Sequence, residues 1–233
     1  MPFPTNDIAV LIFSRQAQEE AKEKKFASRL GKRGGIGLAN KMIDATLSAA
    51  HSSPFPVFMI FSDKQKGTSF GERLANGIEE VYSHGFSKVI VIGTDCPTLT
   101  TENILEAGEK LCSHSLVLGP SPDGGTYLIG LDKEAYFREI FLQVPWLTDA
   151  VLSHLKNFSL DSGFSFAIEP LQKDLDNLSD VYQWRHHNSA HAISLFFNAL
   201  LASLHQVYNI YLFLYHPQFF LDTSTLRGPP ATE

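Results

Sequence analysis

The stretch VIVIGTDCP, residues 89–97, decides the fold of this chain. Four branched apolar residues lead into Gly93, and Asp95 follows before Pro97. A continuous apolar run without polar alternation is typical of a strand that is covered on both faces of a parallel sheet. Proline stops such a strand because it has no backbone N–H to donate. We therefore expect Asp95 at the carboxyl end of a central strand, where ligands bind in open α/β sheets.

Strand and helix patterns alternate on both sides of this stretch. Besides 88–93, strands are expected at 8–14, 56–61, 115–120, 126–131 and 164–169. Helices are expected at 36–50, 70–85, 100–111, near 133–142, near 148–157 and from about 177. This alternation predicts a mainly parallel sheet with helices on both faces, which is a Rossmann-like three-layer α/β/α sandwich. We expect this domain to span 1–184, followed at 185–233 by a C-terminal helix and a proline-containing tail.

The residues directly after the strands are the candidate ligand-binding positions. They are Ser14-Arg15, Ser62-Asp63, Thr94-Asp95-Cys96-Pro97 and the loop from Ser121 to Asp123. Alone, an Asp-Gly-Gly sequence is more often a tight turn than a binding site. Together, Asp95 and Asp123 at two strand ends predict a Mg²⁺ or Mn²⁺ site, because Mg²⁺ prefers one or two carboxylates plus phosphate oxygens and waters.

The overall composition narrows the function classes. A net charge of −6 argues against a nucleic-acid-binding protein, since phosphate neutralisation needs a basic face. Cys96 and Cys112 provide neither a disulfide framework nor a zinc spacing. The first residues lack a cationic segment and a cleavage pattern, so we expect no signal peptide and a cytoplasmic protein.

The segment 189–215 contains no Asp, Glu, Lys or Arg and is long enough to span a bilayer. Five polar residues interrupt it, and such groups are costly in hydrocarbon: His191, Asn198, His205, Gln206 and Asn209. We expect a helix packed on the domain or forming a homodimer through the C-terminal helix. Membrane attachment is the less favoured alternative.

Six segments in a fixed order carry a resemblance to a known family. They are IFSR (12–15), QKGTSFGERL (65–74), VIVIGTDCPTLT (89–100), LVLGPSPDGGTYLIGL (116–131), PWLT (145–148) and DLDNLSDV (174–181). Through them, residues 7–184 resemble the GT-A-type nucleotide-diphospho-sugar transferase superfamily, and more narrowly bacterial glycosyltransferase-like relatives of 2-phospholactate guanylyltransferase. The resemblance implies a GT-A-type fold, a nucleotide or nucleotide-sugar donor, and Mg²⁺ or Mn²⁺.

The resemblance also implies roles for individual residues. Asp95 and Asp123 match the catalytic positions that hold the metal against the donor phosphates. Asp174 and Asp176 match an acidic pair that Thr-Pro follows in relatives, whereas Asn177-Leu178 follows it here. The nucleotide would contact the first loop, the segment beside the base or ribose, and the glycines that permit close backbone approach: Phe13, Ser14, Arg15, Gln65, Gly67, Phe70, Gly71, Gly124 and Gly125.

The loop after the first strand departs from the family pattern. Relatives carry a Pro- and Gly-containing loop that ends in Lys-Thr-Arg-Leu and grips the donor phosphates, but here the segment is RQAQEEAKEKKFASRLG (15–31). One hypothesis is that Lys24, Lys25 and Arg29 contact the phosphates instead. The other is a solvated helical face with i,i+4 pairs such as Glu20–Lys24.

These hypotheses lead to two functions. The first is a metal-dependent glycosyl- or nucleotidyltransferase. The second is a catalytically degenerate protein of the same fold that binds a nucleotide or a protein partner without turnover.

Overall fold

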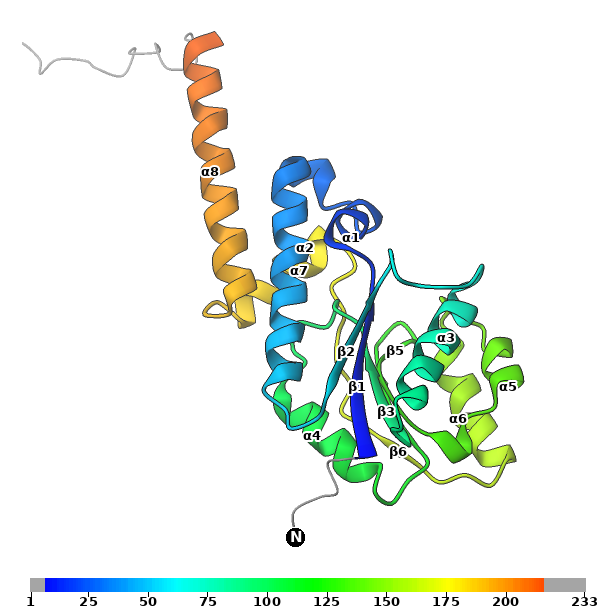
Figure 1. The fold of residues 1–233 in the computed structure, drawn as a ribbon. Helices are drawn as coiled ribbons and strands as arrows, with labels where there is room; N and C mark the ends of the chain where they lie inside the picture. Colours follow the sequence, from blue (N-terminus) through cyan, green and yellow to red (C-terminus); the bar gives the residue numbers. More distant parts are fainter. Residues whose placement is uncertain (1–6, 216–233) are drawn as a thin grey trace, which may run out of the picture.

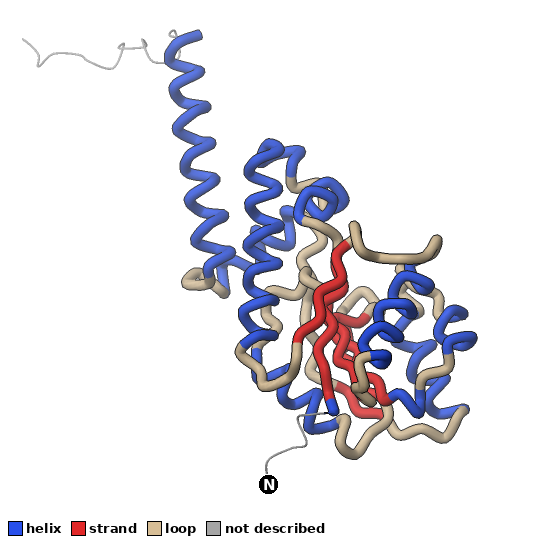
Figure 2. Tube along the Cα trace, viewed as in Figure 1, coloured by secondary structure: helices blue, strands red, loops and turns tan. Residues whose placement is uncertain are grey.

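A six-stranded sheet forms the centre of the computed structural model, which describes residues 7–215 (Figures 1 and 2). The strands, in the order β2-β1-β3-β5-β4-β6 across the sheet, are Val57–Phe61, Ile8–Ser14, Lys88–Ile92, Thr126–Asp132, Leu116–Pro120 and Phe166–Ile168. β1 pairs in parallel with β2 and β3, and β4 with β6. β5 runs antiparallel to β3 and β4, because the short loop from β4 into β5 cannot make a crossover. The predicted mainly parallel sheet is confirmed.

Alternate residues of each central strand face opposite layers of helices. Leu11 and Phe13 of β1 pack with α3 (Phe70–Ser83) and the layer that includes α6 (Val151–Asp161). Val10 and Ile12 face the opposite core, which α4 (Thr101–Lys110) and the end of α2 (Ala27–His51) cover. Figure 1 shows these layers on the two sides of the sheet. The three-layer α/β/α sandwich is therefore confirmed.

Side-chain caps fix where several helices begin. Thr100 accepts a hydrogen bond from the Asn103 amide at the start of α4, and Asn177 accepts from the Asp180 amide at the start of α7 (Leu178–His187). Ser69 and Glu72 form a capping box at the start of α3. The starts predicted near 100 and 177 are thus observed.

Two segments differ in detail from the sequence prediction. The region predicted as one helix near 133–142 is a 3-10 turn at Lys133–Ala135 followed by α5 (Arg138–Gln143). The polar segment before residue 36 contains α1 (Ala17–Glu23) and the first turns of α2. Gly31 has φ +69 inside α2 and bends it there, since this left-handed conformation strains other residues.

The C-terminal helix α8 (Ala192–Tyr215) packs on α2 through its first half and continues past it in Figure 1. Phe197 and Ile193 are buried against Phe26 and Met42. Among residues 7–215, no helix combines the length and hydropathy needed to cross a membrane. A homodimer through α8 stays a prediction, and most of the predicted tail lies outside the described residues.

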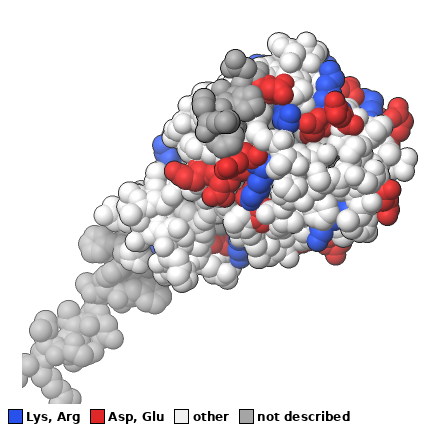
Figure 3. All heavy atoms as spheres, turned by 90° about the horizontal axis from the view of Figure 1, so that it is seen from below, with Lys and Arg blue, Asp and Glu red and all other residues white. Residues whose placement is uncertain are grey.

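Figure 3 shows the charge on one face of the molecule. On that face Lys and Arg side chains are scattered among Asp and Glu side chains and form no continuous basic patch.

Candidate functional site

The carboxyl ends of three parallel strands meet at a cleft of about 590 Å³. Its walls include Ser14 at the end of β1, Thr94 and Asp95 after β3, and Ser121 and Asp123 after β4. Ser14 and Thr94 are joined across the cleft floor by a hydrogen bond of 2.6 Å between their hydroxyl groups. The predicted ligand face is thus a real concavity of the described structure.

The strand end of β2 does not contribute to this cleft. Ser62 instead accepts a hydrogen bond from the Gln16 amide at 3.1 Å, and Asp63 is exposed. The expectation that Ser62-Asp63 faces the ligand is therefore wrong. The physical reason is the strand order, which puts β2 at the edge of the sheet.

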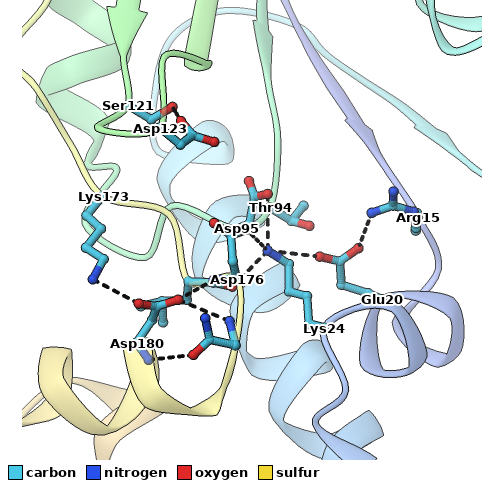
Figure 4. A network of polar contacts seen from close by, with 12 residues as sticks. Arg15, Glu20, Lys24, Thr94, Asp95, Ser121, Asp123, Lys173, Asp176 and Asp180 are labelled. Atoms are coloured by element: carbon cyan, nitrogen blue, oxygen red, sulfur yellow. Dashed lines mark hydrogen bonds and ion pairs between the residues drawn. The ribbon is translucent and has the colours of Figure 1, made fainter. Parts of the chain in front are cut away.

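Asp123 is both part of a turn and a wall of the cleft. Its Oδ1 accepts hydrogen bonds from the Ser121 hydroxyl at 2.7 Å and from the Gly125 amide at 3.0 Å. Gly124 between them has φ +85. These bonds fix the carboxylate through one oxygen and leave Oδ2 for a ligand, as Figure 4 shows. Turn and site are therefore two properties of the same loop.

A buried lysine bridges the opposite wall. The Lys24 ammonium donates to the Leu175 carbonyl at 2.8 Å and to Asp176 Oδ1 at 3.0 Å (Figure 4). It also lies 3.4 Å from Asp95 Oδ2 and 3.5 Å from Glu20 Oε1. Burial alone would lower the pKa of Lys24, but the charges of Asp95, Glu20 and Asp176 outweigh it and raise that pKa. The ammonium therefore stays charged inside the cleft wall.

This geometry revises both hypotheses for residues 15–31. The i,i+4 pair Glu20–Lys24 exists, but both side chains are about 95% buried, so the solvated helical face is wrong at these two positions. Glu20 also accepts a hydrogen bond from Arg15 at 3.2 Å. Lys25 and Arg29 are exposed and do not line the cleft, because the chain turns away at Lys25 with φ 55.

Asp174 lines the cleft and has two properties that the sequence did not predict, a buried oxygen and a raised pKa. Its Oδ1 is buried and has no hydrogen-bond partner among the described residues. Burial, followed by the charges of Asp95 and Asp176, raises the pKa of Asp174 to about 8, against an opposing effect of Lys24. Asp180, by contrast, lies in the first turn of α7 and completes its capping box, accepting from the Asp176 and Asn177 amides.

These residues fit a divalent cation of the Mg²⁺ type. Asp95, Asp123 and Asp174 line one cleft, and the Asp174 oxygen that lacks a partner in the described part of the chain is a hard ligand. Within the described part of the chain, no three His, Cys, Asp or Glu side chains form a preassembled metal site. A cation here would need oxygens from phosphates and waters to complete its coordination.

The remaining wall of the cleft is aromatic. Phe13 and Phe70 meet edge to face with ring centres 5.8 Å apart, and Phe70 lies 5.7 Å from Trp146. Gln65 beside them donates to the Ser14 carbonyl at 2.8 Å. Trp146 lines the cleft and also packs within this wall, where it donates to the Phe141 carbonyl.

The predicted glycines divide into two groups. Gly125 lines the cleft, whereas Gly67, Gly71 and Gly124 do not. Gly71 instead lies under the Trp146 ring, where a Cβ would come within 2.7 Å of Trp146 Cδ1. Its role in the described structure is to let this wall form.

Asp174→Asn is expected to change the pH dependence of stability in metal-free buffer. The folded state keeps the Asp174 proton up to about pH 8, while the unfolded state loses it near its ordinary pKa, so ionisation lowers stability as pH rises between these values. Asparagine resembles the neutral form and removes this loss. Thermal unfolding in EDTA should give similar stabilities near pH 4. At pH 8 the variant should be more stable, by roughly 3–5 kcal/mol, since each unit between the two pKa values corresponds to about 1.4 kcal/mol. A variant less stable than wild type at pH 8 contradicts the assignment.

Part of the chain matches a known protein family. Residues 48–148 match the family described as "Uncharacterized protein conserved in bacteria (DUF2064)", a stretch that includes Asp95 and Asp123. A comparison with curated proteins gives no match.

Among solved structures, a candidate nucleotide-diphospho-sugar transferase from Desulfovibrio desulfuricans G20 superposes with a TM-score of 0.76 at 17% identity. The match covers 86% of this chain and 97% of that one. An rv0371c homologue from Mycobacterium sp. strain JC1 gives 0.46 at 11% identity, covering 76% and 94% of the two chains. Molybdopterin-guanine dinucleotide biosynthesis protein A from Archaeoglobus fulgidus gives 0.38 at 14% identity, covering 80% and 89%. The first match confirms the nucleotide-diphospho-sugar transferase fold that the sequence resemblance implied.

Proposed function

We propose that this chain is a metal-dependent transferase that uses a nucleotide-activated donor, in a nucleotidyl or glycosyl transfer. One observation carries the proposal. Three strand ends bring Ser14, Asp95 and Asp123 to a single cleft, where a buried oxygen of Asp174 has no hydrogen-bond partner among residues 7–215. Both the position at the carboxyl ends and the oxygen-rich chemistry suit a metal-bound phosphate group.

Different residues of the cleft would bind the metal and the donor phosphates. Asp95 and Asp123 would hold Mg²⁺ or Mn²⁺, with Asp174 as a further oxygen donor. A bound cation supplies neutralisation of the charge that develops on the departing phosphate. Lys24 and Arg15 would contact the donor phosphates, because both cationic side chains line the cleft.

The aromatic wall suits the nucleoside part of the donor. Phe13 and Phe70 offer apolar ring surface beside the Gln65 amide, and Trp146 extends that surface. Flat rings of this kind pack well against a base or a sugar face. Gly125 leaves its backbone open to close approach, since it has no side chain.

A second candidate function rests on the altered first loop. Lys24 is engaged with Asp95 and Asp176 rather than free in a phosphate-gripping loop. This favours, as the alternative, a catalytically degenerate nucleotide- or protein-binding member of the same fold. For the nucleotide-binding form of this alternative, the two candidates differ in turnover and not in binding.

Thermal unfolding with a panel of nucleoside triphosphates and nucleotide sugars, with and without Mn²⁺, tests the proposal. At least one donor should raise the melting temperature only when Mn²⁺ is present, because a ligand that binds only the folded state stabilises it. Incubating that donor with protein should then release diphosphate or a nucleotide. Binding without release supports the degenerate alternative, and no metal-dependent shift with any donor contradicts both nucleotide-binding functions.

A further inference from the structure

The Lys24 ammonium lies in the cleft wall at a point where several carboxylates converge. It contacts carboxylates from three separate elements: Glu20 of α1, Asp95 after β3, and Asp176 before α7 (Figure 4). Only about 6% of its side chain is exposed. A buried ammonium among three carboxylates neutralises their charge, and removing it would leave these carboxylates unpaired.

We infer that Lys24 competes with the divalent cation for Asp95 and thereby couples metal binding to donor binding. The inference rests on the proposed function, in which Asp95 holds the metal. Asp95 Oδ2 lies 3.4 Å from the ammonium, the longest of its hydrogen bonds, whereas the Leu175 carbonyl is at 2.8 Å. Of the carboxylates around the ammonium, Asp95 is the one that would also hold the metal, and its contact is longer than those to Leu175 and Asp176. An incoming cation would therefore replace this contact.

Because of this competition, a divalent cation should bind weakly to Asp95 when no donor is present. A divalent cation at Asp95 would lie close to the positive charge of Lys24, and two like charges at this range repel strongly in a partly buried site. Donor phosphates remove that penalty, because their negative oxygens can take both the metal and the ammonium as partners. Metal and donor should therefore each strengthen the binding of the other, as a coupling between two sites requires.

Glu20 serves as the positioning residue of this arrangement. It is buried, holds Lys24 at 3.5 Å and accepts from Arg15 at 3.2 Å. With Asp176 at 3.0 Å and Glu20 at 3.5 Å still beside it, Lys24 can release Asp95 without becoming an unpaired buried charge. The lysine also keeps the Leu175 carbonyl, so only one of its contacts needs to change.

Lys24→Met tests the coupling with two probes that need no knowledge of the donor base. The first probe is Mn²⁺ alone, measured by the electron paramagnetic resonance signal of the free ion. The second is inorganic triphosphate with Mg²⁺, measured by calorimetry. The variant should bind Mn²⁺ alone about tenfold more tightly and Mg²⁺-triphosphate about tenfold more weakly.

Two further variants make the outcome interpretable. Lys22→Met removes the same charge from an exposed position outside the cleft, and it should leave both affinities unchanged. Glu20→Gln combined with Lys24→Met removes the lysine without leaving Glu20 as an unpaired buried carboxylate. If Lys24→Met alone unfolds, this double variant should still bind Mn²⁺ more tightly than wild type.

The failure of this inference differs from the failure of the proposed function. Wild type that binds Mg²⁺-triphosphate, together with variants that bind Mn²⁺ no better than wild type, overturns the competition and leaves the transferase proposal standing. Wild type that binds neither probe overturns both. Opposite shifts of the two affinities in Lys24→Met, absent in Lys22→Met, support the competition, since a purely structural role would weaken both.

Discussion

Asp95→Ala is expected to abolish the metal-dependent stabilisation of the protein by its donor and to lower turnover at least a hundredfold. Losing one preorganised group that stabilises developing charge typically costs about 10²–10³ in rate. At a donor concentration of about 100 times Kd, wild type should gain about 2.7 kcal/mol from binding, and the variant should lose this gain. The fold should persist, because the Asp95 backbone carbonyl still accepts from the Leu175 amide at 2.8 Å.

Asp63→Ala is the matched control for this experiment. Asp63 also follows a parallel strand, but it is exposed and does not line the cleft. Its removal should leave the metal-dependent shift and the turnover unchanged. If both variants lose the shift equally, a general charge effect explains the result and Asp95 has no special role. If Asp95→Ala keeps the full shift, Asp95 does not hold the metal.

The second large effect is expected from Gly124→Ala, which should lower the free energy of unfolding by about 3 kcal/mol or more. Gly124 has φ +85, and a Cβ there would lie 2.8 Å from the Asp149 carbonyl carbon, a backbone atom that cannot rotate away. The loop is also tied by a hydrogen bond of 3.0 Å from the Leu152 amide to the Gly124 carbonyl. The substitution therefore adds a clash to an unfavourable backbone conformation.

Gly163→Ala separates the two contributions. Gly163 has φ +72, but a Cβ there would meet nothing within 4 Å. Gly163→Ala should therefore lower the free energy of unfolding by about 1 kcal/mol, from the backbone strain alone. Urea unfolding of the three proteins measures the difference. Equal losses in the two variants would show that the Asp149 backbone moves aside at no cost, and would contradict the added clash.

The fold was largely predictable from the sequence because its signals are local. Apolar runs mark the buried strands, and Thr100 and Asn177 begin helices through their own side chains. The antiparallel direction of β5 was not specified, since its apolar run TYLIGL looks the same whichever way the strand runs. The short loop around Asp123 is the feature that determines this direction.

Site residues were predictable where they follow a central strand closely or lie in a segment that resembles the family. Asp95 and Asp123 meet the first condition, Gln65 and Phe70 meet the second, and all four line the cleft. Lys24 was named as a phosphate ligand, yet its burial and its contact with Asp176 depend on a chain segment about 150 residues away. Asp174 appeared only as half of an acidic pair, because an orphaned oxygen is a property of packing that no spacing records.

The two walls of the cleft also differ in how far apart along the chain their contacts lie, which has a consequence for folding. In the Asp123 wall, the hydrogen bond from Ser121 to Asp123 joins residues two positions apart within the β4–β5 hairpin. The Lys24 wall needs contacts that span 151 and 152 residues. Contacts of long sequence separation form late, since the loop they close costs more entropy. We therefore expect the Asp123 wall to form early in folding and the Lys24 wall to form last. In hydrogen exchange of the native protein, the amides around Leu175 should open before those of the hairpin.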